Sequence, residues 1–225
     1  MNAFFWLAVT VAVYLLAKRL YRVFGKIYLT PLLVTPAVLI AILLCSGVSF
    51  DNYDKGAGWL SDLVEPATVA LAVTLYKHID VLRKHAPAIA AGAGCGAVSA
   101  IVTSVGLARL FDLQPNVTDS LAPRSATTPI AVGVSQLVGG IPTVTAVATL
   151  ITGLFGLLMG PPIVRALRMR TPVARGILLG TSAHSAGISK ALEYDAATGS
   201  IATIAMMLTA FVTLAATPWI LSLLG

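Results

Sequence analysis

Apolar residues fill most of this 225-residue chain in long blocks, and short charged segments separate the blocks. A helix needs about 20 mostly apolar residues to cross a lipid bilayer. Hydrophobic residues make up 57% of the chain and charged residues only 11%, whereas an average soluble domain is about 25% charged. So few charges do not cover the surface of a soluble domain of this size. The sequence therefore predicts an all-α fold, a polytopic membrane helix bundle.

The apolar blocks predict about seven full spans and one short element within a single integral membrane domain over residues 1–225. The first block lies in an N-terminal helix expected over 4–20, and its charges follow it rather than precede it. A cleavable signal carries its charges first, so we expect this helix to be retained. The blocks are Phe4–Leu16, Leu29–Ser46, Trp59–Tyr76, Ala86–Phe111, Ser125–Val138, Ile141–Val164, Pro172–Ala191 and Ser200–Leu224.

Basic residues indicate the orientation of the blocks. Of the 15 Lys and Arg residues, 11 lie in three short loops, at 17–28, 77–85 and 164–175. Because Lys and Arg concentrate on the cytoplasmic side of membrane proteins, we assign these loops to the inside. The N-terminus is then predicted outside and the C-terminus inside.

One apolar block cannot be a full span if the three basic loops all lie inside. The chain must cross the membrane an even number of times between the inner loops at 77–85 and 164–175, and three apolar blocks lie between them. Ser125–Val138 is the shortest block, and Pro123 and Gly139-Gly140 bracket it. Apolar segments of 10–14 residues are more often re-entrant than spanning. We therefore expect a short broken helix near 125–140 that lines a cavity.

A weak internal similarity favours a different interpretation of the same block. The sequence around Pro31 is similar to the sequence around Pro129, which indicates an inverted repeat of segments 29–111 and 123–222. Transporters often contain such repeats, with binding sites at interrupted helices. A full repeat needs 125–138 to cross completely, so it conflicts with the charge count, on which we rely more.

Polar groups inside the apolar blocks are the candidate functional residues, because each costs free energy at membrane depth unless it is paired or hydrated. Arg124-Ser125-Ala126-Thr127-Thr128-Pro129 places a guanidinium and three hydroxyls at the start of a helix, where free N–H groups favour an anion. Plain helix capping is the simpler alternative for the hydroxyls and the proline.

Two further residues are candidates for binding or for carrying a coupled proton. His184 lies among small and hydroxyl-bearing residues and is expected to bind substrate or move a proton. Glu65, beside Pro66, is the second candidate for proton coupling. Small residues and prolines predict hinges or close helix packing; these are Gly139, Gly140, Pro142, Gly180 and Gly187.

Other functional classes lack support in the sequence. There is no basic stripe with interleaved aromatic residues, so nucleic-acid binding is not expected. No metal-ligand spacing is present, and we expect neither a metal nor another cofactor. The chain also lacks a Gly-x-Ser-x-Gly elbow, so we expect no enzyme activity and assign no catalytic residue.

Several motifs together resemble the LrgB/CidB family, whose relatives include bacterial YohK proteins. They are Asn-Tyr-Asp-Lys-Gly at 52–56, Glu65-Pro66-Ala67, Pro123-Arg124-Ser125-Ala-Thr127-Thr128-Pro129, Gly139-Gly140-Ile141-Pro142, Arg175-Gly176 and Gly180-Thr-Ser-Ala-His184. The resemblance covers nearly the whole chain. It implies a protein of the bacterial plasma (inner) membrane that forms homo-oligomers and acts beside a small LrgA/CidA-type membrane partner.

The resemblance implies two functions. Family members are described as holin-like or antiholin-like regulators of murein hydrolase export and autolysis, whereas a plastidial relative is a glycolate/glycerate transporter and bacterial relatives are linked to pyruvate uptake. Our leading hypothesis is a transporter or facilitator of small monocarboxylates of the glycolate, glycerate, lactate or pyruvate class. The alternative is a regulator of autolysis that acts by oligomerisation.

Overall fold

The computed structural model describes residues 3–63, 66, 69, 73, 76–77 and 79–224. Within these residues all regular elements are helices, in agreement with the all-α expectation. Four described helices are long and apolar enough to cross a membrane: Phe4–Phe24, Arg83–Leu110, Pro142–Ala166 and Ala196–Leu224. The chain divides into two compact units, 1–72 and 73–225. The sequence-based repeats stay a prediction.

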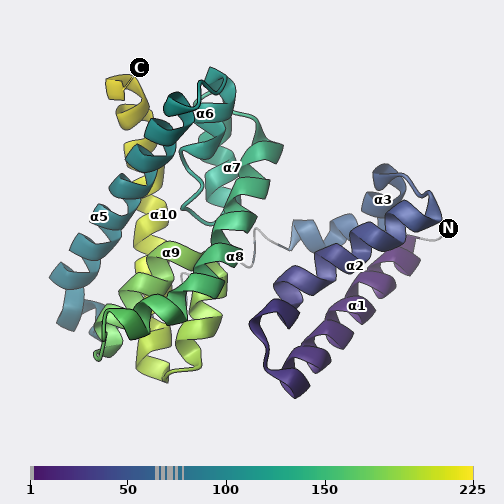
Figure 1. Ribbon diagram of the computed structural model, residues 1–225, viewed down its shortest axis with the longest axis horizontal. Coiled ribbons are helices and arrows are strands. Elements are labelled where there is room, and N and C mark those ends of the chain that lie inside the picture. The colour runs from purple at the N-terminus through teal and green to yellow at the C-terminus, as the bar shows by residue number, and fades with distance from the viewer. Residues whose placement is uncertain are drawn as a thin grey trace. The chain divides into compact units, whose positions relative to one another are not determined.

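The smaller unit contains α1 (Ala3–Phe24), a short 3₁₀ turn η1 (Ile27–Leu29), α2 (Pro31–Ser46) and α3 (Phe50–Asp62) (Figure 1). Aromatic residues join α1 to α3: the rings of Trp6 and Tyr53 lie 5.7 Å apart, edge to face. The Tyr53 hydroxyl also lies 3.1 Å from Thr10 Oγ1. Most other large apolar side chains of α1 are exposed, as expected for a helix that faces lipid.

The larger unit is built on three long helices, α5 (Ile79–Leu110), α8 (Pro142–Ala166) and α10 (Ala196–Leu224) (Figure 1). The early parts of α5 and α10 pack together through Ile89 and Ile201. Their late parts pack together through Val105 and Ile220. These two helices therefore run parallel, and the C-terminus of the chain lies at the same end of the unit as the end of α5.

A hairpin of two short helices fills the chain between α5 and α8. It consists of α6 (Pro115–Leu121), the non-helical segment 122–127 and α7 (Thr128–Leu137). At 10 residues, α7 is about 15 Å long, half the thickness of the apolar core of a bilayer. The short broken element expected near 125–140 is thus confirmed as α7 and the segment that precedes it.

The arms of this hairpin are fastened near the start of α8. Thr145 Oγ1 lies 2.7 Å from Ser135 Oγ of α7 and 2.9 Å from the Ser120 carbonyl of α6, and all three residues are fully buried. The backbone N–H of Ile141 donates to Ser120 Oγ at 2.6 Å. Gly140 touches the same serines, so closely that a side chain has no room there. The segment 122–127 is therefore the tip of a hairpin that is held at its base.

A second hairpin, α9 (Pro172–Leu192), follows α8. Its backbone leaves the helical region at His184, where φ is 48° and ψ is −135°. A straight helix would separate Leu179 from Gly187 by about 12 Å, yet the Gly187 Cα faces the Leu179 carbonyl in direct contact. The structure therefore differs from the full span expected over Pro172–Ala191, because the helix turns back on itself at His184.

Glycines let the first arm of α9 approach its neighbours closely. A Cβ added to Gly156 of α8 would lie 2.5 Å from the Ala183 Cβ, and one added to Gly92 of α5 would lie 2.5 Å from Ile177. Gly180 contacts the Ala202 carbonyl of α10 in the same way. Three helices thus pack closely against this arm, as small residues allow.

Candidate functional site

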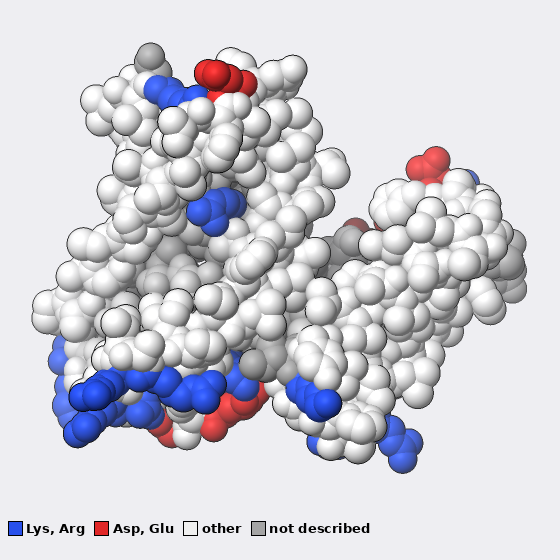
Figure 2. Space-filling model, viewed as in Figure 1, with Lys and Arg blue, Asp and Glu red and all other residues white. Residues whose placement is uncertain are grey.

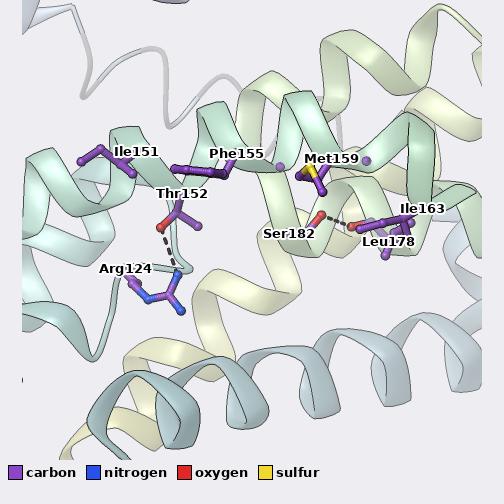
Figure 3. A pocket seen from close by; sticks show the side chains of 10 residues that line it. Arg124, Ile151, Thr152, Phe155, Met159, Ile163, Leu178 and Ser182 are labelled. Atoms are coloured by element: carbon purple, nitrogen blue, oxygen red, sulfur yellow. Dashed lines mark hydrogen bonds between the residues drawn. The ribbon is translucent and has the colours of Figure 1, made fainter. Parts of the chain in front are cut away.

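Arg124 is the residue around which the candidate site is built. It lies in the tip segment 122–127, where its Nε donates to Ser104 Oγ of α5 at 2.7 Å and its Nη1 donates to Thr152 Oγ1 of α8 at 3.1 Å (Figure 3). Thr152 is 10 residues from the start of α8 and 14 from its end, about 15 Å and 21 Å along the axis. The guanidinium therefore lies near the middle of the long helices rather than at their ends.

The charge of Arg124 has no acidic partner among the described residues. The ion pair between Lys190 and Glu193 lies elsewhere, at the end of α9. In the space-filling view, basic side chains gather at the lower end of the larger unit, others lie at its upper end beside acidic atoms, and one basic group is visible in a hollow at mid-height (Figure 2). A partly buried cation without a countercharge is costly at membrane depth unless an anion or water reaches it.

A polar pocket of about 340 Å³ lies on one side of Arg124. Its walls come from α5, the tip segment, α8 and α9, and six of its lining residues carry hydroxyl groups: Ser99, Thr103, Ser125, Thr152, Thr181 and Ser182. With the guanidinium, these side chains form a cation surrounded by oxygen atoms. Such a pocket can hold a small anion that also carries polar groups.

Most of these hydroxyls donate their hydrogen to a backbone carbonyl of their own helix. Thr103 Oγ1 donates to the Ser99 carbonyl at 2.7 Å, and Ser182 Oγ donates to the Leu178 carbonyl at 2.6 Å. Ser99, Thr152 and Thr181 donate to their own helices in the same manner. Because a hydroxyl carries one donor and two lone pairs, these five side chains offer acceptors to the pocket. The donors come from Arg124 and from Ser125, whose buried Oγ has no described partner.

A second pocket, also about 340 Å³, begins at Arg124 and extends along α8 (Figure 3). It shares Arg124, Thr152 and Ser182 with the polar pocket. The rest of its wall is apolar, except for two glycines. We call it the α8 groove.

His184 forms the tip of the second hairpin and meets the tip of the first. Its side chain is 6% exposed, and its imidazole lies against the backbone of Arg124 and close to the guanidinium charge. The Nε2 atom is buried without a hydrogen-bond partner among the described residues. The two non-helical tips are therefore in contact beside the pockets, from hairpins that enter the larger unit from opposite ends.

The structure brings together part of the predicted set. Arg124 and Ser125 line the polar pocket, and His184 contacts Arg124. Thr127 precedes α7 and its buried Oγ1 has no described partner, but neither pocket includes it. Thr128 is exposed and lines neither pocket. Glu65 lies outside the described residues.

The predicted hinge and packing residues occupy turns and close contacts. Gly139 has a φ of 87°, a conformation that glycine adopts without strain. Pro142 opens α8 in its first turn, where a proline loses no helical hydrogen bond. Gly180 and Gly187 both face backbone carbonyls.

Sequence reasoning missed the residues that surround Arg124. Ser104 and Thr152 hold the guanidinium, and Ser99, Thr103, Thr181 and Ser182 line its polar side. Each lies inside an apolar block that the sequence predicts as a span. The sequence signal that could have identified them is the presence of hydroxyl side chains in a predicted span. This signal is not specific, because serines and threonines in membrane helices often form hydrogen bonds only with the backbone of their own helix.

Comparison with known proteins places the chain in a family. Residues 10–223 match the family described as the LrgB-like family. The chain is 47% identical to the uncharacterized protein YwbG of Bacillus subtilis (strain 168), with 96% of each chain covered. It is 36% identical to the uncharacterized protein YxaC of the same strain, over 89% of this chain and 87% of YxaC. It is 29% identical to the antiholin-like protein LrgB of Bacillus cereus (strain B4264), over 100% of this chain and 98% of that protein.

No solved structure matches the chain, so the geometry of the site stands on the present structure. The expected family is confirmed by the match over nearly the whole length, and the long apolar helices agree with a membrane protein. The chain belongs to the LrgB-like family of membrane proteins.

Proposed function

We propose that this protein is a transporter or facilitator of small monocarboxylates. The observation that carries the proposal is the position of Arg124, a half-buried cation near the middle of the long helices, without a described acidic partner and open to a polar pocket. A carboxylate supplies the missing charge and matches the planar guanidinium with two parallel hydrogen bonds. At membrane depth, such a site fits the passage of an anion better than its permanent storage.

The hydrogen-bond pattern of the polar pocket favours hydroxy acids within this class. Its walls offer mainly acceptors, as described above, so a substrate hydroxyl can donate to Thr103 or Thr181 while its carboxylate binds Arg124. Glycolate, glycerate and lactate carry such a hydroxyl. Pyruvate carries a carbonyl in the same place and must rely on Ser125 or on water for a donor.

The two hairpins supply an arrangement that is typical of transporters. Interrupted helices that meet near the middle of the membrane form substrate sites in several transporter folds. In this proposal, movement of one hairpin tip opens the site to one side while the other tip keeps it closed. His184 contacts the other tip and is one candidate for carrying a coupled proton. Glu65 is the second candidate, on the evidence of the sequence.

Uptake by the purified full chain in liposomes tests the proposal. Labelled glycolate, lactate and pyruvate should accumulate or equilibrate faster than in empty liposomes, and Arg124→Gln should lower the rate at least tenfold. Arg109→Gln is the matched control, because Arg109 is an exposed arginine in the last turn of α5. Absence of carboxylate uptake by the wild type, or equal rates in the two variants, would overturn the proposal.

The name of the Bacillus cereus relative, antiholin-like protein LrgB, supports a second candidate, an antiholin-like regulator of autolysis. In this role the protein acts by oligomerisation, together with an LrgA/CidA-type partner in the bacterial plasma membrane. Lysis assays in a deletion strain separate the two functions. Arg124→Gln should retain lysis control if assembly alone matters, and should lose it if carboxylate movement underlies that control.

A further inference from the structure

The α8 groove has an apolar wall of regular spacing. Ile151, Phe155, Met159 and Ile163 recur every four residues along α8, so they form one row on the helix surface (Figure 3). Leu178 of α9 also lines the groove. The groove is therefore lined along its length by apolar side chains.

Two glycines bring α8 and α9 close together at the floor of the groove. Gly156 and Gly160 lie four and eight residues after Thr152, in the row beside the apolar one. Neither has a side chain, and α9 packs directly on them: an added Cβ would lie 2.6 Å from Leu179 at Gly160. The floor of the groove is thus backbone, and it extends about 12 Å from Thr152 to Gly160.

The groove is amphipathic because one of its ends is charged. Arg124, Thr152 and Ser182 stand where the groove meets the polar pocket. The guanidinium uses two of its five N–H groups on Ser104 and Thr152, which leaves three for a ligand. A cation at one end and an apolar row beyond it match a carboxylate that carries an apolar tail.

We propose that the α8 groove binds monocarboxylates with an apolar tail, such as unbranched alkanoates, with the carboxylate on Arg124 and the tail along the row from Phe155 to Ile163. This proposal rests on the proposed function in that both use Arg124 as the anion-binding group. It adds a second ligand class, because small hydroxy acids fill only the polar pocket.

A membrane phospholipid is the competing occupant, and the depth of Arg124 argues against it. Phospholipid phosphates lie at the membrane surface, about 15 Å from the middle of the apolar core. Thr152, which holds Arg124, is about 15 Å from the start of α8. An acyl chain alone can reach the groove but brings no charge to the guanidinium.

The experiment measures how straight-chain carboxylates protect the full chain against thermal unfolding in lipid nanodiscs, and converts the concentration dependence into a Kd. The series runs from acetate through butyrate to hexanoate, with hexanamide as the uncharged counterpart of hexanoate. The Kd should fall with each added methylene by up to about fourfold, because each buries apolar area. Hexanamide should give no measurable protection.

Three variants assign the effect to the groove. Arg124→Gln should weaken acetate and hexanoate alike, by at least tenfold. Phe155→Ala should weaken hexanoate several-fold and leave acetate unchanged. Leu158→Ala is the matched control: Leu158 is an exposed apolar residue of α8 outside the groove, and its replacement should change neither Kd.

The outcomes separate this inference from the proposed function. If acetate and hexanoate bind equally and both need Arg124, the groove proposal is overturned and the anion site survives. If no carboxylate binds, both proposals fall. If hexanoate and hexanamide bind alike and Arg124→Gln has no effect, the groove holds apolar chains without regard to charge, and the inference is again overturned.

Discussion

Arg175 and Tyr194 lie 19 positions apart, at opposite ends of α9, yet the guanidinium carbon of Arg175 lies 5.1 Å from the centre of the Tyr194 ring. Arg175 Nε also donates to the Met169 carbonyl at 2.9 Å, in the loop before α9. The two ends of α9 are thus fastened to each other, and the helix between them must turn back. This contact closes the base of the second hairpin.

Chemical cross-linking checks the hairpin directly. In a background with Cys45→Ser and Cys95→Ser, Arg175→Cys and Tyr194→Cys should be joined in high yield by a short bis-thiol reagent. Arg175→Cys and Ser185→Cys should not, because Ser185 lies beside the distant tip. A straight helix gives neither cross-link, since Ser185 is then about 15 Å from Arg175 and Tyr194 is farther away. Peptide mass spectrometry measures the two yields.

The bend at His184 predicts an unusual order of stabilities. Both His184→Gly and His184→Ala remove the imidazole, so they differ only in backbone preference. At a φ of 48° an L-residue is strained by about 1–2 kcal/mol, and glycine is not. His184→Gly should therefore have the higher free energy of unfolding, by about 1 kcal/mol. Within an unbroken helix, His184→Ala would instead be the more stable variant by about the same amount. The sign of the difference in unfolding free energy between the two variants therefore shows whether the helix is bent at this position.

Close packing between α8 and α9 predicts that a single methyl group is harmful at Gly156. The added Cβ would lie 2.5 Å from the Ala183 Cβ and 2.7 Å from the Ser182 carbonyl oxygen. Gly156→Ala should lower the free energy of unfolding by about 1–3 kcal/mol, as other overpacked sites do. Gly106→Ala in α5 is the control, because no atom lies within 4 Å of its added Cβ. It should be neutral or stabilising by up to about 1 kcal/mol, as measured by denaturant titration of the two variants.

Asp195 predicts a pH dependence at the start of α10. Its carboxylate accepts hydrogen bonds from the backbone N–H of Thr198 at 2.7 Å and from the Thr198 hydroxyl at 2.9 Å. The backbone bond first, then the hydroxyl bond and the nearby Arg175 charge, hold the pKa of Asp195 below its ordinary value of 3.8. A lowered pKa in the folded state means that the ionised carboxylate stabilises the protein.

This stabilisation is fully present above the ordinary pKa and is lost as the pH falls below 3.8 through the lowered pKa of the folded state. The melting temperature of the wild type should therefore exceed that of Asp195→Ala from pH 7 down to about pH 4. The difference should shrink at lower pH. A difference in melting temperature that stays constant down to pH 2 would contradict stabilisation by the ionised Asp195 carboxylate.

The acceptor wall of the polar pocket predicts substrate preference. If Thr103 and Thr181 accept from a substrate hydroxyl, lactate should be taken up faster than pyruvate at equal concentration. Replacement of either threonine by valine should reduce this preference by about threefold to tenfold, the equivalent of about one hydrogen bond. The fold should be unaffected, because each hydroxyl bonds only to its own helix. Competition between labelled lactate and unlabelled pyruvate measures the ratio.

The two hairpins differ in how far the sequence could predict them. The first was accessible because Ser125–Val138 is too short to span and because Pro123 and Gly139-Gly140 bracket it. The second was not, although α9 is less apolar than the four helices that could span: it has the length of a span, and its bend occurs at His184 rather than at a proline or glycine. Tertiary contacts, such as that between Arg175 and Tyr194, determine the turn, and such contacts leave no local periodic signal.

The candidate site shows the same division. Arg124 and His184 were accessible because charged or titratable groups are rare in apolar segments. Their contact was not, since 60 positions of sequence separate them and no pattern brings the two tips together. Ser104 and Thr152 were missed for the same reason: their role depends on the approach of Arg124 from another element.

The fold-back of α9 also changes the side of the membrane on which the chain ends. With one crossing fewer after the 164–175 loop, an assignment of that loop to the cytoplasm sends α10 outward instead of inward. Under that assignment the C-terminus is expected outside rather than inside, on the side that the sequence predicts for the N-terminus. A fluorescent or enzymatic reporter fused after Leu224 should be active only if it tolerates export.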